Sequence, residues 1–133
     1  PKLKNLNCWW PVLNDLCRSA KKENLIKIKS DGSALRDFIS LDDNSNFVKI
    51  LINKKVNENI INLCSSETLS IKELAYKIQS NEFFKQKISL SFAKKPKKDK
   101  NKRFFYDNKI MRKYNFKRKD SLENKIKKFL IQI

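Results

Sequence analysis

Apolar side chains recur at helical spacing near the start of the chain and then alternate with basic ones. Residues 13–22 carry apolar positions three or four residues apart, which predicts a helix with one buried face. Pro11 stands where this helix begins, a position at which proline removes no hydrogen bond that the helix needs. Residues 25–29 alternate as a short strand does, and the turn-forming residues 30–33 end it.

A second extended stretch and a second helix follow. Residues 36–41 are predicted to be extended. Asp42 or Asp43 can cap the next helix, because a carboxylate accepts hydrogen bonds from the first free backbone amides. We expect one apolar face on this helix, made of Phe47, Val48, Leu51 and Ile52.

The rest of the pattern completes a mixed α/β fold. Residues 59–64 are a short apolar run bounded by polar residues, which predicts a buried strand. Ser70 is expected to cap a helix over 71–79, with Glu73 as the reciprocal partner of a capping box. Beyond it we predict a strand over 87–92, a basic loop over 94–102 and a closing amphipathic helix over 121–131.

Length and composition fit a single domain. The chain has 133 residues and is 40% hydrophobic, enough for a modest core. No apolar run reaches the roughly 18 to 20 residues of a membrane helix, and no signal-type apolar core follows the N-terminus. We therefore expect a cytoplasmic protein with no membrane partner. Cys8, Cys17 and Cys64 form no C-x-x-C pair, which argues against a disulfide framework or a zinc site and favours small buried thiols.

The formal net charge of +17 is unevenly distributed. Residues 1–90 carry 15 Lys and Arg against 10 Asp and Glu, whereas residues 91–133 carry 16 against 4. Such an excess is typical of nucleic-acid binding proteins. Lys greatly outnumbers Arg, however, and Arg is the residue favoured for bidentate recognition of phosphates and bases. A Lys-, Asn- and Ile-rich composition therefore accounts for much of the charge.

Two residue types exclude whole classes of site. The chain has no histidine, which excludes catalytic triads and histidine-based metal centres. Its one glycine, Gly32, excludes a G-x-G-x-x-G turn and a P-loop, since both need several positions without a side chain near the phosphates. We therefore expect no cofactor site within this chain.

The segment around Gly32 carries a specific motif. Residues 31–43 read Asp-Gly-Ser-Ala-Leu-Arg-Asp-Phe-Ile-Ser-Leu-Asp-Asp. This segment closely resembles a signature of the extended short-chain dehydrogenases/reductases, the NAD-dependent nucleotide-sugar epimerase/dehydratase family. Residues 62–75 are similar to that family's later strand, turn and helix, although Ser66 stands where the family commonly has glycine. Three further stretches look like the family's last segment, namely residues 106–109, 114–116 and 121–126.

These matches occur in family order and spacing, and they cover the chain from about Trp9 to its end. The resemblance implies that residues 1–133 are the C-terminal, substrate-binding part of such an enzyme, used in surface-polysaccharide synthesis. It implies that a Rossmann half, absent here, binds NAD or NADP and supplies a catalytic Tyr-x-x-x-Lys pair. No Tyr-x-x-x-Lys occurs in this sequence, so we expect no catalytic residue here and no activity of the chain alone. The resemblance does not distinguish an epimerase from a dehydratase or a reductase.

The resemblance also assigns candidate substrate contacts. By matching position, the resemblance implies that Arg36 contacts the diphosphate of a nucleotide sugar, and a planar guanidinium can donate to two phosphate oxygens at once. The alternative is that Arg36 is a surface residue paired with Asp37 or Asp43. Lys95 stands where the family often has an arginine that binds the same diphosphate. The alternative is that Lys95 only belongs to a solvated loop. Ile26 and Ile28 are candidates for contact with the nucleotide base, although core packing explains them equally well. Asn14 and Trp10 are candidates because they lie near the family's substrate loop.

Two other interpretations come from different classes. One is a small basic nucleic-acid-binding or ribonucleoprotein component, in which residues 94–119 would bind phosphates and their aromatic residues would stack on bases. The other is a fragment whose exposed apolar face, normally covered by the Rossmann half, drives self-association. Expected partners are accordingly a nucleotide-diphosphate sugar and either the Rossmann half or a homo-oligomer partner; we do not expect nucleic acid.

Overall fold

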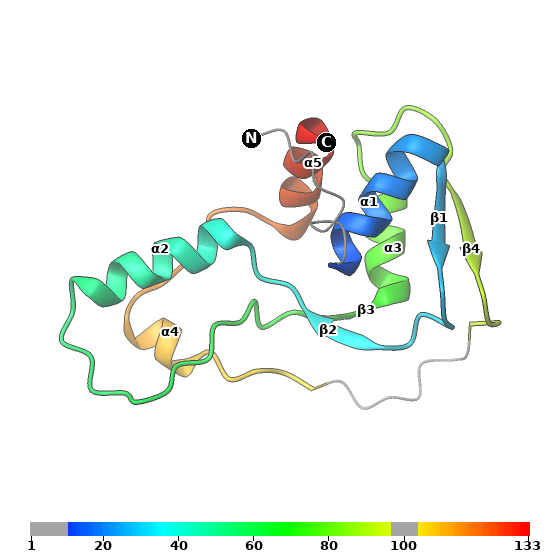
Figure 1. Cartoon of the computed structure of the whole chain (residues 1–133). Helices are drawn as coiled ribbons and strands as arrows, with labels where there is room; N and C mark the ends of the chain where they lie inside the picture. The colour runs from blue at the N-terminus through cyan, green and yellow to red at the C-terminus, as the bar shows by residue number, and fades with distance from the viewer. Residues whose placement is uncertain (1–10, 97–103) are drawn as a thin grey trace.

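The computed structural model describes residues 11–96 and 104–133 and has a mixed α/β architecture, which confirms the predicted fold class (Figure 1). Along the chain the elements are α1 (Val12–Glu23), β1 (Leu25–Ile28), β2 (Leu35–Asp37), α2 (Leu41–Ile52), β3 (Thr68–Ser70), α3 (Ile71–Gln79), β4 (Ser89–Phe92), α4 (Lys109–Lys113) and α5 (Leu122–Gln132). No helix among the described residues is both long and apolar enough to cross a membrane.

The strands form two separate pairs. β1 and β4 are parallel, with Ile26 opposite Leu90 and Ile28 opposite Phe92. The chain between them runs through β2, α2, β3 and α3, the long connection that a parallel pair requires. β2 and β3 are antiparallel, and Arg36 is opposite Leu69.

A main core lies between the helices α1, α3 and α5 and the strand β1 (Figure 1). Ile26, Leu74 and Ile126 are fully buried there, one from each of β1, α3 and α5. Burial of these side chains is the dominant favourable contribution to folding. α1 contributes Leu16, Cys17 and Ala20, the apolar face that its sequence spacing predicts.

A small core lies on the other side of the molecule, where α2 and α4 are found (Figure 1). It consists of Phe47, Cys64, Met111 and Phe116, with the rings of Phe47 and Phe116 edge to face at 5.2 Å between centroids. We call the part of the chain that surrounds it, namely α2, residues 53–64 and residues 109–116, the small lobe.

Local capping chemistry starts the longer helices. Ser70 accepts a hydrogen bond from the Glu73 amide, and Glu73 accepts from the Ser70 amide, which confirms the predicted capping box. The predicted cap of α2 is wrong. Ser40, rather than Asp42 or Asp43, accepts from the amide of Asp43, because the helix begins at Leu41 and both aspartates lie in its first turn.

Gly32 occupies a position that few other residues could fill. Its φ is 75°, in the left-handed region. A β-carbon there would lie 3.0 Å from Lys72 Cβ and 3.2 Å from Phe92 Cε1. The Gly32 carbonyl also accepts a hydrogen bond from the Lys72 amide at 2.9 Å. The turn therefore fits closely between α3 and β4, as the single glycine of the sequence suggests.

Two predictions for the small lobe are wrong. Residues 59–64 form no strand, and Ile60 is 79% exposed. The four apolar residues expected on one face of α2 are divided: Phe47 is buried and Leu51 is half-buried, whereas Val48 and Ile52 are exposed. α4 was not predicted because five residues are too few to show a periodic pattern.

Candidate functional site

Arg36 lies at the centre of β2 with an exposed side chain. One guanidinium nitrogen, Nη1, donates to the carbonyl of the neighbouring Leu35 at 2.7 Å. Neither of the carboxylates that could have neutralised it does so. Asp37 accepts from the amide of Ser65 at 2.6 Å, and Asp43 forms an ion pair with Lys125. Within the described residues Arg36 therefore keeps most of its donors available for an external anion.

Asp37 differs from its neighbour in being turned inward. Its Oδ1 is bound by Ser65, whereas its Oδ2 is buried without a hydrogen-bond partner among the described residues. Adjacent residues of a strand point to opposite sides, so Arg36 projects away from this carboxylate. The strand thus separates an inward negative charge from an outward positive one.

The carboxyl ends of β1 and β4 meet near the turn that leads to β2. The Ala93 amide donates to the Ile28 carbonyl at 2.8 Å, and the Lys94 amide to the Ser30 carbonyl at 3.4 Å. Lys95 follows directly and is exposed. Ligands of α/β proteins commonly bind outside the carboxyl ends of strands. This end of the molecule carries positive charge from Lys29, Lys94 and Lys95, all of them exposed.

The N-terminus of α3 faces the same turn but offers no open amides. The amide of Ile71 donates to Ala34 at 3.0 Å, that of Lys72 to Gly32 at 2.9 Å, and that of Glu73 to the Ser70 hydroxyl at 3.1 Å. Because these first-turn donors are already used, α3 cannot bind an anion as free helix N-termini do. Any anion bound at this end would depend on exposed side chains rather than on these backbone amides.

The remaining candidates have different positions. Ile26 is fully buried and Ile28 is 3% exposed, and both belong to the main core, which favours their packing interpretation. Asn14 is half-buried on α1 and has interactions of its own. Trp10 lies outside the described residues. The structure therefore places Arg36 and Lys95 at the surface and does not bring the two isoleucines to the surface with them.

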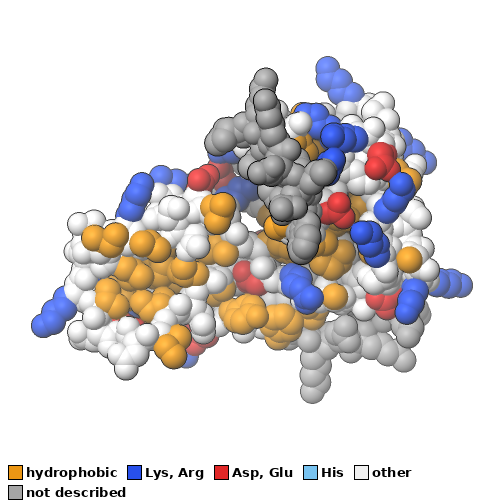
Figure 2. All heavy atoms as spheres, viewed as in Figure 1, with side chains coloured by type: hydrophobic (Ala, Val, Ile, Leu, Met, Phe, Trp, Pro, Cys, Tyr) orange, Lys and Arg blue, Asp and Glu red, His pale blue; other side chains and the backbone are white. Residues whose placement is uncertain are grey.

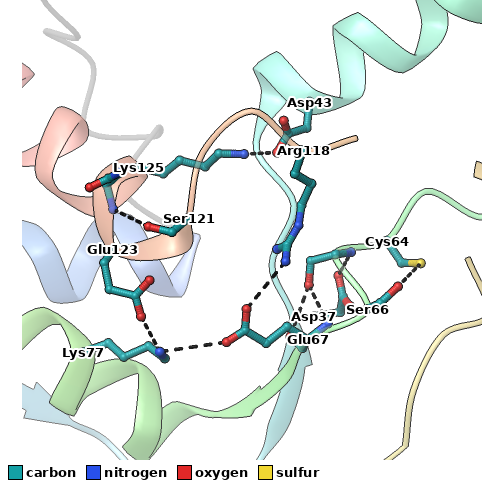
Figure 3. A network of polar contacts seen from close by, with 12 residues as sticks. Asp37, Asp43, Cys64, Ser66, Glu67, Lys77, Arg118, Ser121, Glu123 and Lys125 are labelled. Atoms are coloured by element: carbon teal, nitrogen blue, oxygen red, sulfur yellow. Dashed lines mark hydrogen bonds and ion pairs between the residues drawn. The ribbon is translucent and has the colours of Figure 1, made fainter. Parts of the chain in front are cut away.

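A polar network connects the main core to the small lobe (Figure 3). Glu67 lies between Lys77 at 3.9 Å and Arg118 at 3.8 Å, and Lys77 also bonds Glu123. The hydrogen bond from Lys77 lowers the pKa of Glu123 and raises that of Lys77. Two residues further along α5, Lys125 bonds Ser40 at 2.9 Å and pairs with Asp43, whose side chain is 3% exposed.

Sequence reasoning missed this network, because its partners are 10 to 85 residues apart and carry no motif. A charge count shows that opposite charges are available but not which of them meet. The network holds the start of α2 against α5. It thereby also fixes the end of the segment that runs from β2, with Arg36, to α2.

The aromatic residues of the nucleic-acid interpretation are only partly available. Phe104, Phe105 and Tyr106 are 43%, 66% and 48% exposed, but Phe104 and Tyr106 pack edge to face at 5.5 Å. The Tyr114 hydroxyl donates to Glu58, a pairing that raises the tyrosine pKa. Residues 97–103, which belong to the same basic stretch, lie outside the described residues.

The described residues show neither a cluster of metal ligands nor a glycine-rich loop. The described residues contain no group of three or more His, Cys, Asp or Glu side chains able to hold a metal ion. Burial raises the pKa of Cys17 to about 12, so this thiol stays protonated. Gly32, the single glycine, is packed against Lys72 and Phe92 and cannot form a glycine-rich pyrophosphate loop.

Comparison with known proteins gives a result at the level of structure. No family model matches the sequence, and a search of curated proteins finds no match. Among solved structures the chain is similar to TunA, described as an NAD-dependent NDP-hexosamine 5,6-dehydratase involved in tunicamycin biosynthesis, with a TM-score of 0.71 and 19% identity. The likeness is one of fold.

The alignment covers 92% of this chain and 40% of the TunA chain. The present chain therefore spans less than half the length of the protein it is similar to. The match agrees with the resemblance drawn from residues 31–43 and 62–75, because a nucleotide-sugar enzyme contains a part with this fold.

Proposed function

We propose that this chain is the nucleotide-diphosphate-sugar binding part of an NAD(P)-dependent sugar-modifying enzyme, an epimerase, dehydratase or reductase. The observation that carries the proposal is Arg36: it is exposed on β2, and both neighbouring carboxylates are engaged elsewhere. The fold shared with TunA supports the same class of enzyme.

The proposed role of Arg36 is to hold the diphosphate. A guanidinium donates two parallel hydrogen bonds to phosphate oxygens and stays charged at any physiological pH. Its present bond to the Leu35 carbonyl uses one donor and leaves the others for a ligand. Lys95 would add a second positive charge, without the planar fork of an arginine.

Positioning is the contribution that such a site makes to catalysis. A diphosphate fixed at β2 would orient the attached sugar toward reacting groups, and correct orientation can account for several kcal/mol of a reaction barrier. A nicotinamide cofactor, bound by polypeptide outside this sequence, would supply the hydride chemistry. The chain alone is therefore not expected to turn over a substrate.

Titration calorimetry with UDP and a UDP-sugar tests the proposal. We expect Arg36→Ala to weaken binding roughly 10- to 100-fold, since hydrogen bonds to charged groups are worth about 1.5–3 kcal/mol. Arg36→Lys should recover only part of the loss, because lysine keeps the charge but not the fork. Arg112→Ala, which removes an exposed arginine from α4 in the small lobe, is the matched control and should bind as the unchanged chain does.

The same titration with a short single-stranded oligonucleotide covers the rival function. Oligonucleotide binding that weakens steeply with salt and does not depend on Arg36 would contradict the proposal and favour nucleic-acid binding. A diphosphate affinity that is equal in the unchanged chain and in Arg36→Ala would also contradict it.

A further inference from the structure

The described part of the chain has two cores that share no residue. The main core takes its buried side chains chiefly from α1, α3, α5 and β1, and the small core takes its own from α2, α4 and nearby loops. The change from one to the other falls between neighbours, because Phe38 packs against the main core and Ile39 against the small one. Proteins open locally in cooperative units, and side chains packed in separate clusters can belong to separate units.

Extended segments join the small lobe to the main core. Figure 1 shows α2 and α4 on one side of the molecule and α1, α3 and α5 on the other, and Figure 2 shows the same two parts as space-filling surfaces. The chain crosses between them at residues 38–40, 65–67, 104–108 and 117–121, and none of these segments is helix or strand. Loop residues can change their backbone angles without breaking a helix or a strand. The small lobe can therefore come away while the main core keeps its own structure.

A buried ion pair connects the two parts. Lys125 on α5 pairs with Asp43 in the first turn of α2 (Figure 3). The Asp43 side chain is 3% exposed and that of Lys125 is 19% exposed. The Lys125 ammonium group also donates to the Ser40 hydroxyl at 2.9 Å, the same hydroxyl that accepts from the Asp43 amide and caps α2. One lysine of α5 therefore contacts both the cap and the first turn of the small-lobe helix.

A second charge contact, between two of the connecting segments, is more exposed. Arg118 lies 3.8 Å from Glu67, and their side chains are 34% and 42% exposed. Exposed pairs contribute little to stability. Loss of one partner of a buried pair is strongly destabilising, because the other charge is left buried and uncompensated. The closed arrangement of the small lobe therefore depends more on Lys125 and Asp43 than on Arg118 and Glu67.

We propose that the small lobe is a separate cooperative unit that opens while the main core stays folded, and that the pair Lys125–Asp43 is the latch that keeps it closed. In the open state this pair is broken and the small core is exposed to water. β2 stays with the main core, since it pairs with β3 and the Ala34 carbonyl accepts from the Ile71 amide at 3.0 Å. Opening therefore releases α2 but leaves β2 in place.

Hydrogen exchange of the unchanged chain, followed by NMR, is the first test. Small-lobe amides such as those of Leu51 and Phe116 should be at least about tenfold less protected than the amide of Ile126 in α5. Low concentrations of urea should raise the exchange of Leu51 and Phe116 equally, because one opening exposes both. Equal protection of all three amides, or different urea dependences for Leu51 and Phe116, would overturn the proposal.

A main-core variant distinguishes two units from one. Ile78 is fully buried on α3, and Ile78→Val should lower the protection of main-core amides roughly two- to tenfold. Small-lobe amides should keep their protection, because the contacts of Ile78 persist while the small lobe is open. An equal loss of protection in both parts would mean a single cooperative unit and would contradict the proposal.

Lys125→Met tests the latch, since it removes the ammonium group and keeps a long apolar side chain. It should lower the protection of small-lobe amides at least about tenfold, because Asp43 is left buried and uncompensated. Adding Asp43→Asn should recover part of the loss, because no unpaired charge then remains. Lys127→Met is the matched control on the same helix: its partner Glu82 is 69% exposed and follows α3, so small-lobe amides should not change.

Two results would disprove the latch. One is unchanged small-lobe protection in Lys125→Met, and the other is an equal loss in Lys127→Met. If Lys125→Met does not fold, the unchanged chain and Ile78→Val still decide whether the small lobe opens separately. Arg36→Ala should leave the exchange pattern unchanged, so this proposal and the proposed function can fail independently.

Discussion

Ser66 has a backbone conformation that serine rarely adopts. Its φ is 62°, in the left-handed region where a β-carbon approaches the following carbonyl. The resemblance described in the sequence analysis places Ser66 where the family commonly has glycine. Serine is strained in this conformation, and the fold around Ser66 holds it there.

Replacing Ser66 with glycine should stabilise the chain. We expect Ser66→Gly to raise the free energy of unfolding by about 1 kcal/mol, because the left-handed conformation no longer costs steric energy. Urea denaturation followed by circular dichroism measures the change. Ser45→Gly is the control, an exposed residue within α2, and should lower stability by ~0.5 kcal/mol. A loss of stability in Ser66→Gly would show that the left-handed backbone carries no strain.

At the scale of elements, the sequence predicted what depends on near neighbours. The capping box of α3 needs only Ser70 and Glu73, three residues apart, and it was predicted correctly. The cap of α2 was assigned two or three residues too late, because Ser40, Asp42 and Asp43 lie within four residues of each other and all are good caps. Residues 59–64 were predicted to be a buried strand, but a strand needs a partner, and pairing is not encoded locally.

The capping box makes a prediction about α3. Ser70→Ala removes the hydroxyl that accepts from the Glu73 amide, and it should lower the free energy of unfolding by about 1 kcal/mol. Ser70→Thr, which keeps the hydroxyl, should lose less. Chemical denaturation of the three chains gives the comparison, and equal stability of Ser70→Ala and the unchanged chain would rule out a contribution from the cap.

Glu58 links residues 55–63 to α4 and makes the chain sensitive to acid. Hydrogen bonds from Lys113 and then from Tyr114 lower the pKa of Glu58 from 4.5 to about 2. Between these values the unfolded chain binds a proton that the folded chain does not, so this stabilisation is present above the ordinary pKa and is lost as the pH falls toward 2.

Glu58→Gln should therefore be less stable than the unchanged chain near neutral pH. Its stability should also fall less steeply between about pH 5 and about pH 2, because one shifted carboxyl group no longer titrates. Denaturation midpoints at a series of pH values measure both effects. Glu82→Gln, which removes the more exposed pair with Lys127, should follow the unchanged chain. Parallel pH profiles for Glu58→Gln and the unchanged chain would contradict the assigned shift.

At the scale of the whole molecule, the mixed α/β class was predictable, but the division into a main core and a small lobe was not. Periodicity identified α1, α3 and α5, whose buried faces meet in the main core. The small core joins Phe47, Cys64, Met111 and Phe116, which are distant in sequence and share no pattern. Long-range packing of this kind depends on the complete chain path, as does the exposure of the outer face of α2.

Of the candidate site, the sequence identified the residues but not their environment. Arg36 and Lys95 were assigned by resemblance, and the structure adds that both are exposed. That Asp37 and Asp43 would leave Arg36 unpaired could not be predicted, because their partners Ser65 and Lys125 lie 28 and 82 residues away. For Ile26 and Ile28 the sequence could not decide between a ligand pocket and the core, because an apolar strand pattern fits both equally well.

The contact between Arg36 and a diphosphate is the central claim, and NMR observation of arginine side chains during a titration with UDP tests it most directly. The account predicts that the Nε–H signal of Arg36, assigned with Arg36→Lys, shifts as UDP or inorganic pyrophosphate is added, while that of Arg112 does not. A saturating titration in which Arg36 stays unchanged while Arg112 or Arg118 shifts would contradict the account.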